Sequence, residues 1–508
     1  MTQSDRDDFP ALARARTLWD RGQTDPALEA FETALAEQPE NLKALLEAAR
    51  AFGGRFEIAR AVELLDRATA LGGEDPPVAL QIAVSYARIF REHRAMDLLE
   101  HMANRSAPAR AELSALYERA GRIDEALAEI DACIRAAPSA AEPRLARARL
   151  LRRQGRGADG VEMLRRLTRP GLPEALRAEA WTELCYHHDS RGAAEEAAAA
   201  IAQAHGILRA RPGVADLLAM ARKNNARIAA MARDFSTTTL QRWQQETAPA
   251  GPAMAHLVGF PRSGTTLLEQ CLDAHPGLIA SPERVVFTRD ILPRLCQAGG
   301  GPLTVATLDR IPRSLVACQR ARYLTYMQAA LDTVLAGRVH LDKNPNHTGL
   351  LPALLRMDPA ARLVIALRDP RDVVTSCVLR SFRLTEFSAM LLDWGSAAEL
   401  YAAEMGAWLR YRREIDPGQW VETRYEDMVA DPMGEVRRIL PALGLEWDAA
   451  VTRYRDRLDG KIVNSPTQTE VRQPVHGRAV GRWRAYRRFL EPHLPVLQPF
   501  LTAFGYDD

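Results

Sequence analysis

The sequence has few of the features that mark secreted, membrane-spanning or metal-binding proteins. Its six cysteines are scattered among 508 residues without a CxxC pair, which favours buried thiols in a reducing compartment over disulfides or a zinc site. The N-terminus, MTQSDRDDFP, is polar, and no apolar run approaches about 18 residues. We therefore expect no signal peptide, no membrane span and a cytoplasmic location.

Charge of one sign is not in excess either. The chain has 67 basic and 65 acidic residues, a net charge of +2, which gives no support for binding to nucleic acid or to an anionic membrane surface. Its 47% hydrophobic content is ordinary for a globular protein, and its length is sufficient for two or more domains.

Residues 11–212 show a repeat. They are rich in Ala, Leu, Arg and Glu, a composition typical of helices. Ala27, Ala61 and Ala95 are small residues spaced 34 positions apart. Gly22 and Gly121 each lie five positions before a small residue of this kind. This period resembles the tetratricopeptide repeat, in which each unit is a pair of antiparallel helices. We expect about six units, which act either as a scaffold alone or as a groove for a peptide or protein partner.

The sequence changes in character after the repeats. We expect a disordered N-terminus over 1–10, the repeat array over 11–212, a helix and linker over 213–250, and a second domain over 251–508. In that domain short apolar runs at 254–260, 362–367 and 419–424 alternate with helical segments, which predicts an α/β fold with a parallel sheet. Ligands of such sheets bind at the carboxyl ends of the strands.

The first such strand end carries the segment GFPRSGTT, residues 259–266. Gly259 and Gly264 have the spacing of the phosphate-binding rule GxxxxGK[ST], but Thr265 occupies the lysine position. The glycines permit close approach of an anion to the backbone, and the following helix directs free N–H groups toward it. Without the lysine, an NTPase or nucleotide kinase is disfavoured.

The second informative strand end carries RDPRDVVTS, residues 368–376. Asp369 is expected to cap the following helix and Pro370 to occupy its first position. Arg368 and Ser376 should then lie near one another, although Arg368 could instead pair with Asp369 or Asp372. Two basic sites at one sheet edge favour a ligand with two separated anionic groups.

Taken in order, the segments PRSGTT, RDPRDVVTS, TRYEDMVADP and VRQPVHGRAVGRW resemble those of sulfotransferases that use 3′-phosphoadenosine 5′-phosphosulfate (PAPS), including the tyrosylprotein sulfotransferases. The closest likeness is to bacterial proteins that place tetratricopeptide repeats before the sulfotransferase domain. The resemblance covers about residues 250–508. It implies that the first loop holds the 5′-phosphosulfate, that the second segment holds the 3′-phosphate, and that no metal is required.

The resemblance also implies individual roles. It places Lys343, in HLDKNPNH, near the transferring sulfuryl group, and Thr467 where relatives often have serine. The implied cofactor-binding residues are Arg262, Ser263, Gly264, Thr265 and Thr266 in the first loop, Arg368 and Ser376 at the second site, and Tyr425, Thr467, Arg472 and Arg482 toward the C-terminus.

Transfer to a hydroxyl also requires a base. Glu283 matches the catalytic glutamate of the tyrosylprotein relatives, and we expect it and Lys343 to act at opposite ends of the transfer. His275 and His347 are rival bases, although His275 is more readily explained by a role in shaping a turn.

Two functions of different classes remain. The first is an active PAPS-dependent sulfotransferase whose repeats recruit or position the acceptor. The second is a repeat scaffold with a decayed enzyme domain. The joint presence of Arg262, Glu283, Lys343, Arg368 and Ser376 favours the first. The acceptor could be a tyrosyl peptide, a carbohydrate or a small alcohol.

Overall fold

The computed structural model describes residues 8–246, 251–458 and 472–506. These residues form two compact units. One comprises residues up to Pro143 together with Arg322–Val334, and the other comprises Arg144–Ala321 and the chain from Leu335 onward. No helix within the described ranges is long and apolar enough to cross a membrane.

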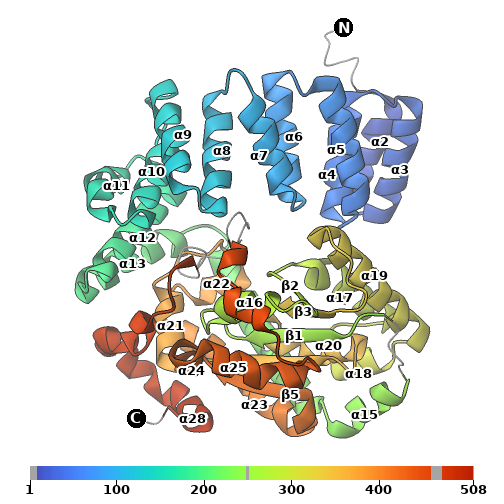
Figure 1. Ribbon diagram of the computed structural model, residues 1–508, viewed down its shortest axis with the longest axis vertical. Helices are drawn as coiled ribbons and strands as arrows, with labels where there is room; N and C mark the ends of the chain where they lie inside the picture. Colours follow the sequence, from blue (N-terminus) through green and yellow to red (C-terminus); the bar gives the residue numbers. More distant parts are fainter. Residues whose placement is uncertain (1–7, 247–250, 459–471, 507–508) are drawn as a thin grey trace. The chain divides into compact units, whose positions relative to one another are not determined.

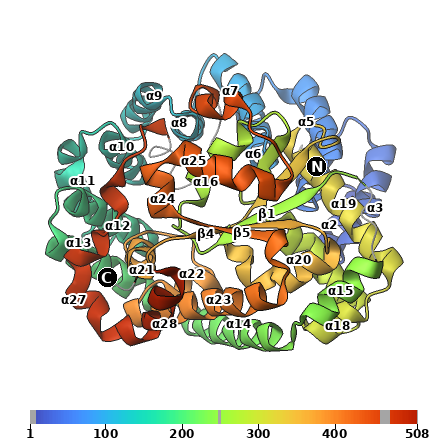
Figure 2. The same cartoon turned by 60° about the horizontal axis from the view of Figure 1, so that its bottom comes forward.

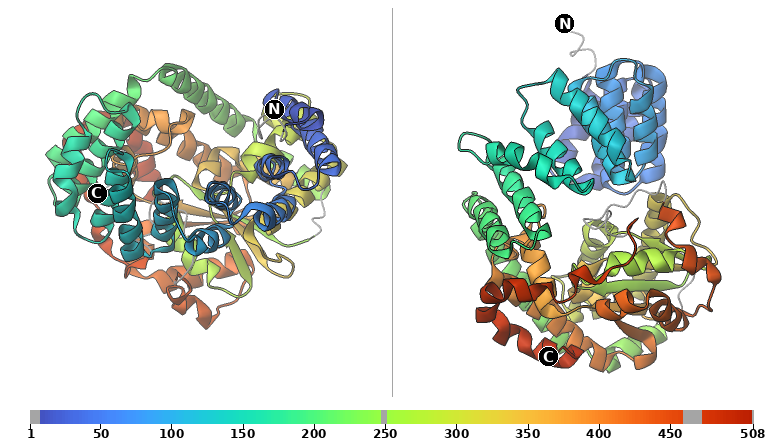
Figure 3. Two further views of the ribbon diagram at one scale, coloured as in Figure 1. Left: turned by 90° about the horizontal axis from the view of Figure 1, so that it is seen from above. Right: turned by 60° about the vertical axis from the view of Figure 1, so that its left-hand side comes forward.

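The first unit consists mainly of consecutive helix pairs, seen side by side in blue in the right-hand view of Figure 3. The small residues that define the period, Ala27, Ala61 and Ala95, are fully buried, as expected where two helices approach closely, and so is Ala126, five residues after Gly121. The pairs are α2 (Pro10–Asp20) with α3 (Thr24–Glu37), α4 (Leu42–Gly54) with α5 (Ile58–Gly72), α6 (Pro76–Arg88) with α7 (Glu92–His101), and α8 (Ala107–Ala120) with α9 (Ile123–Ala136).

Two further pairs follow along the chain, so the described helices agree with the expected six repeats. They are α10 (Glu142–Arg153) with α11 (Val161–Leu167), and α12 (Glu174–Ser190) with α13 (Ala194–Arg209). All but the first two residues of this segment belong to the second unit. The boundary between the two compact units therefore lies inside the helical region. The domain ranges 11–212 and 251–508 instead follow sequence motifs, and they remain a prediction. The segment expected as helix and linker contains α14 (Val214–Asp234) and α15 (Thr237–Glu246).

The second unit is built on a five-stranded sheet with the order β2-β3-β1-β4-β5 (Figure 1). All adjacent strands are parallel, which confirms the predicted α/β class. The strands are β1 (Met254–Gly259), β2 (Leu278–Ser281), β3 (Val339–Lys343), β4 (Arg362–Leu367) and β5 (Trp420–Arg424). The short strands β2 and β3 were not predicted, because each contains a run of only four or five residues, at the lower limit of recognisable strands.

Helices cover both faces of this sheet, as buried parallel strands require. In Figure 2, α16 (Thr265–Asp273), α24 (Tyr425–Ala430) and α25 (Pro432–Ile439) lie on one face. On the other face lie α14, α20 (Leu351–Met357) and α23 (Trp394–Glu414). The remaining helices are α17 (Leu292–Ala298), α18 (Val305–Asp309), α19 (Arg313–Leu331), α21 (Pro370–Val378), α22 (Glu386–Met390), α27 (Arg487–Leu490) and α28 (Leu494–Phe504).

Parallel pairing has one consequence for function. Every strand runs in the same direction, so the residues that follow β1, β2, β3, β4 and β5 all emerge at the same edge of the sheet. The segments around Arg262, Arg368 and Tyr425 begin at these strand ends.

Four ionisable side chains are buried within the sheet and beneath it. The carboxylate oxygen Oδ2 of Asp342 lies 3.7 Å from Nδ1 of both His256 and His347, and His340 is fully buried on the same strand as Asp342. Burial disfavours the charged imidazolium and lowers the pKa of His340 and of His347 to about 4. The two histidines are therefore neutral in the folded protein at neutral pH.

This burial predicts acid sensitivity. The unfolded chain binds protons at these two histidines near their ordinary pKa of 6.5, whereas the folded chain binds them only near 4. The free energy of unfolding should consequently fall as the pH is lowered through this window, by roughly 2 kcal/mol per histidine between about pH 7.5 and about pH 5. Urea denaturation across this pH range should show that the free energy of unfolding depends less steeply on pH in His347→Gln than in the wild type. His93→Gln, at an exposed histidine, is the control, and equal slopes in all three proteins would contradict the prediction.

Candidate active site

The loop after β1 has the backbone geometry of an anion-binding turn. Gly259 has φ +145° and Gly264 has φ +88°, and between them Arg262 adopts φ +74°, an uncommon conformation for a residue with a side chain. A Cβ atom on Gly259 would lie 2.3 Å from the carbonyl oxygen of Ala366, so only glycine fits beside β4. α16 begins at Thr265, and its N-terminal end therefore points toward the strand-end edge.

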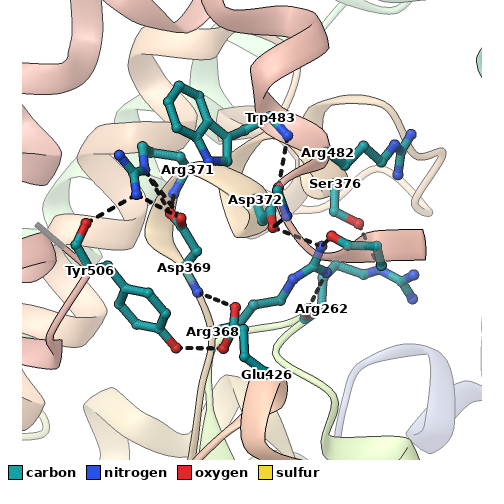
Figure 4. A network of polar contacts seen from close by, with 12 residues as sticks. Arg262, Arg368, Asp369, Arg371, Asp372, Ser376, Glu426, Arg482, Trp483 and Tyr506 are labelled. Atoms are coloured by element: carbon teal, nitrogen blue, oxygen red, sulfur yellow. Dashed lines mark hydrogen bonds and ion pairs between the residues drawn. The ribbon is translucent and has the colours of Figure 1, made fainter. Parts of the chain in front are cut away.

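This loop is joined directly to the second predicted anion site. Nε of Arg262 donates a hydrogen bond to Oγ of Ser376 at 3.2 Å, and the carbonyl oxygen of Arg262 accepts one from Arg368 at 3.0 Å (Figure 4). Arg368 and Ser376 are both almost fully buried. The structure thus brings together the two motifs that the sequence places about a hundred residues apart.

The predicted start of α21 is confirmed. The side chain of Asp369 accepts a hydrogen bond from the backbone N–H of Arg371, and Pro370 occupies the first helical position. Asp369 forms its close ion pair with Arg371 at 2.8 Å, whereas Arg368 lies 3.6 Å from Asp372. Arg368 is held mainly by the carbonyl oxygens of Arg262 and Ala479. Its guanidinium also lies 4.9 Å from the ring centre of Tyr425, a cation–π contact.

Lys343, at the end of β3, is buried between two carboxylates. Its ammonium nitrogen lies 2.8 Å from Oε1 of Glu283 and 3.3 Å from Oε2 of Glu269. Burial acts to lower the pKa of Lys343, but the two carboxylates outweigh it and the net pKa is raised. Lys343 is therefore a permanent cation. The structure places Glu283 and Lys343 in direct contact, and Glu269, the third member of this cluster, was missed because it lies inside a helical pattern.

The two rival histidines, His275 and His347, make contacts that are typical of a structural role. His275 accepts a hydrogen bond from the backbone N–H of Gly277 at 3.0 Å, and its other ring nitrogen lies 2.9 Å from the carbonyl oxygen of Glu446. It precedes β2 and so lies at the amino-terminal edge of the sheet, away from the strand ends. His347 is buried against Phe287, with ring centres 5.5 Å apart, and its lowered pKa makes it a weak base.

Of the four predicted residues toward the C-terminus, Tyr425, Arg472 and Arg482 are described. Arg482 forms a bidentate ion pair with Asp189 of α12, with distances of 3.1 and 2.7 Å. Arg472 is partly exposed and immediately precedes the segment 473–476. Thr467 lies outside the described residues.

Most of the residues predicted to bind the cofactor line a cavity of about 1900 Å³. Arg380, four residues after Ser376, also contributes to its wall and was missed, although a second arginine after a phosphate-binding motif was a usable signal. The predicted residues that line the cavity are Arg262, Gly264, Thr265, Thr266, Glu283, Arg368, Ser376, Tyr425 and Arg482. Ser263 and Lys343 are buried immediately behind this surface. One cavity thus contains several cations, hydroxyl donors and carboxylates.

A substitution at Gly264 tests this geometry. In Gly264→Ala the added Cβ would meet the Tyr425 ring at 2.5 Å, at a position that also has positive φ. We expect the free energy of unfolding to decrease by about 2–4 kcal/mol, because the substitution adds both steric overlap and backbone strain. Gly300→Ala is the matched control, because Gly300 also has positive φ, +71°, but its Cβ would meet nothing within 4 Å. Thermal unfolding should show a distinctly larger decrease for Gly264→Ala, and equal decreases would mean that the contact with Tyr425 is unimportant.

Comparison with known proteins agrees with this arrangement. A family model described as "Sulfotransferase family" matches residues 255–449. Two tetratricopeptide repeat models match residues 18–86 and 112–171. The match to the sulfotransferase family contains β2 to β5, β1 from residue 255, and both predicted anion-binding segments.

The similar proteins match part of the chain. An uncharacterized protein of Aquifex aeolicus (strain VF5) is 27% identical over 254 residues, which are 48% of this chain but only 32% of that protein. Protein-tyrosine sulfotransferase 2 of Gallus gallus is 27% identical over 274 residues, 49% of this chain and 68% of that protein. The solved sulfotransferase domain of the Synechococcus PCC 7002 olefin synthase is 20% identical, covers 50% of this chain and 97% of that domain, and has a TM-score of 0.35. Residues 255–449 thus form a domain that matches the sulfotransferase family, and tetratricopeptide repeats precede it in the chain.

Proposed function

We propose that this protein transfers a sulfuryl group from PAPS to the hydroxyl group of an acceptor. The observation that carries the proposal is the meeting of two cationic strand ends, Arg262 after β1 and Arg368 after β4, in one cavity with Glu283. A ligand with anionic groups at two separated positions suits this arrangement, because each group finds its own guanidinium and hydroxyl donors.

The residues present fit the PAPS molecule. Gly264 supplies a backbone surface without a side chain, and the N-terminal end of α16 offers N–H groups and a positive dipole for the 5′-phosphosulfate. Arg368 and Ser376 supply a buried cation and a hydroxyl for the 3′-phosphate. PAPS, when bound, supplies an activated sulfuryl group on a phosphate leaving group.

Glu283 and Lys343 are suited to the two charge changes of the reaction. As the new S–O bond forms, the acceptor oxygen loses a proton, and the Glu283 carboxylate at the cavity wall can accept it. As the old S–O bond breaks, negative charge grows on the bridging oxygen, and the nearby Lys343 ammonium can stabilise it. Their ion pair at 2.8 Å holds both groups in place before an acceptor binds.

A scaffold with a decayed enzyme domain is the alternative. It is disfavoured because the cationic, hydroxyl and carboxylate groups of the site are not only present but directed at one cavity. We also propose that the repeats recruit or position the acceptor or a protein partner, and we retain the cytoplasmic location expected from the scattered cysteines. Because several similar proteins are named protein-tyrosine sulfotransferases, a tyrosyl peptide is the first acceptor to test, followed by carbohydrates and small alcohols.

The cofactor proposal is tested by binding of PAP, the desulfated product. Arg368→Ala removes a charged hydrogen-bond donor from the cavity and should weaken PAP binding by about 1.5–3 kcal/mol. Arg362→Ala is the control, because Arg362 lies at the other end of the same strand and is exposed. Calorimetry should show a loss only in the first variant, no effect of EDTA, and much weaker binding of ATP. Equal affinity for ATP, or a strict requirement for a metal ion, would contradict the proposal.

The chemical roles are tested by comparing the two carboxylates that contact Lys343. Glu283→Gln removes the proposed base and should lower the rate of the chemical step by about 10²–10⁴-fold while leaving PAP affinity nearly unchanged. Glu269→Gln also removes one carboxylate from Lys343 but leaves Glu283 in place, so its rate should decrease much less. Lys343→Ala should lower both the rate and PAPS affinity. Single-turnover transfer to an acceptor identified with labelled PAPS measures these rates, and near-normal transfer by Glu283→Gln would exclude it as the base.

A further inference from the structure

The helix α12, which precedes the sulfotransferase domain by more than sixty residues, contacts the wall of the cavity. Asp189, in its last turn, accepts hydrogen bonds from Nε of Arg482 at 3.1 Å and from the hydroxyl of Tyr486 at 2.6 Å. Its second carboxylate oxygen lies 2.7 Å from Nη2 of Arg482. One carboxylate thus holds two side chains of the C-terminal segment.

The same face of α12 holds a second part of the wall. Tyr186 lies three residues before Asp189, so the two side chains project from neighbouring positions on one face of the helix. The Tyr186 hydroxyl accepts a hydrogen bond from the backbone N–H of Ser381 at 2.9 Å. The guanidinium of Arg380 lies 5.0 Å from the centre of the Tyr186 ring. Tyr186 and Asp189 therefore each contact an arginine that lines the cavity.

The C-terminal segment also has an anchor inside the catalytic domain. The two carboxylate oxygens of Asp372 accept hydrogen bonds from the backbone N–H groups of Gly481 and Trp483, at 2.7 and 2.8 Å (Figure 4). Arg482 lies between these two residues. Its backbone is therefore fixed by the Asp372 side of the site, whereas its long side chain is fixed by Asp189.

Side-chain fixation matters for binding an anion. A free arginine side chain has up to about 2 kcal/mol of rotamer entropy, part of which is lost when it binds a ligand. The ion pair with Asp189 uses Nε and Nη2 of Arg482, and among the described residues no hydrogen bond from Nη1 is present. The guanidinium can thus be held by Asp189 and still offer N–H groups to a ligand.

We infer that Tyr186 and Asp189 are positioning residues of the cofactor site, which hold Arg380 and Arg482 in place to bind the phosphate groups of the nucleotide. This inference rests on the proposed function. It makes the last helix pair before the catalytic domain a part of the active site as well as a possible recruiting element. The family match at 255–449 contains neither residue, which is why the contribution of α12 is visible only in the tertiary structure.

The first experiment measures PAP binding to the full-length chain by calorimetry. Asp189→Asn retains the shape of the side chain but removes its charge, and should weaken PAP binding by about tenfold to a hundredfold. Glu195→Gln is the matched control, because Glu195, on α13, pairs with Arg488 of the same C-terminal segment but both side chains are largely exposed. Equal PAP affinity in the wild type and Asp189→Asn would overturn the inference.

A double-mutant comparison separates positioning from general destabilisation. If Asp189 acts through Arg482, then Asp189→Asn should weaken PAP binding no further in a chain that already carries Arg482→Ala. Two independent, additive losses would overturn the role assigned to Asp189. Tyr186→Phe should have a smaller effect than Asp189→Asn, since it removes the hydroxyl contact with Ser381 but retains the ring beneath Arg380.

A measurement without ligand keeps the inference testable if PAP does not bind. Hydrogen exchange of the backbone over residues 477–486 should become at least about tenfold faster in Asp189→Asn, because the segment loses one of its two anchors, and should be unchanged in Glu195→Gln. Unchanged exchange in Asp189→Asn would overturn the inference. Failure of the wild-type chain to bind PAP, with the expected change in exchange, would instead refute the proposed cofactor and leave the positioning contact established.

Discussion

The parallel direction of the five strands is the constraint on which the rest of the site depends. In an antiparallel sheet, successive loops would alternate between opposite edges. Here every loop that follows a strand emerges on one side, so residues that follow all five strands can line one cavity. The order β2-β3-β1-β4-β5 places β1, with its glycine loop, at the centre, between β3, which ends in Lys343, and β4, which is followed by Arg368. Both cationic neighbours of the loop follow from this order.

The cations of the site are held in two different ways. Lys343 is nearly fully buried and is neutralised by two carboxylates, which offset the desolvation of its charge. Arg368 is almost as deeply buried, but two backbone carbonyl oxygens and an aromatic ring hold it, with the nearest carboxylate, Asp372, 3.6 Å away. This difference leaves the charge of Lys343 shared with Glu269 and Glu283, whereas Arg368 has, among the described residues, no carboxylate in hydrogen-bond contact.

The helical region does more than link to the unit that contains the sheet, because part of it contacts the cavity. Its last two helix pairs belong to the same compact unit as the sheet, and α12 contacts two walls of the cavity through Tyr186 and Asp189.

The sequence by itself determined the local features of this protein. The 34-residue period, the strand–glycine loop–helix order around Arg262, and the Asp369 cap followed by Pro370 depend on neighbours along the chain, and the structure confirms each of them. Only the tertiary structure decided which side chains meet. The contact between Lys343 and Glu283 joins residues 60 apart and that between Asp189 and Arg482 joins residues 293 apart. The physical reason is that such pairing depends on the strand order and on the packing of helices outside the motif, which no local pattern of charge or hydrophobicity encodes.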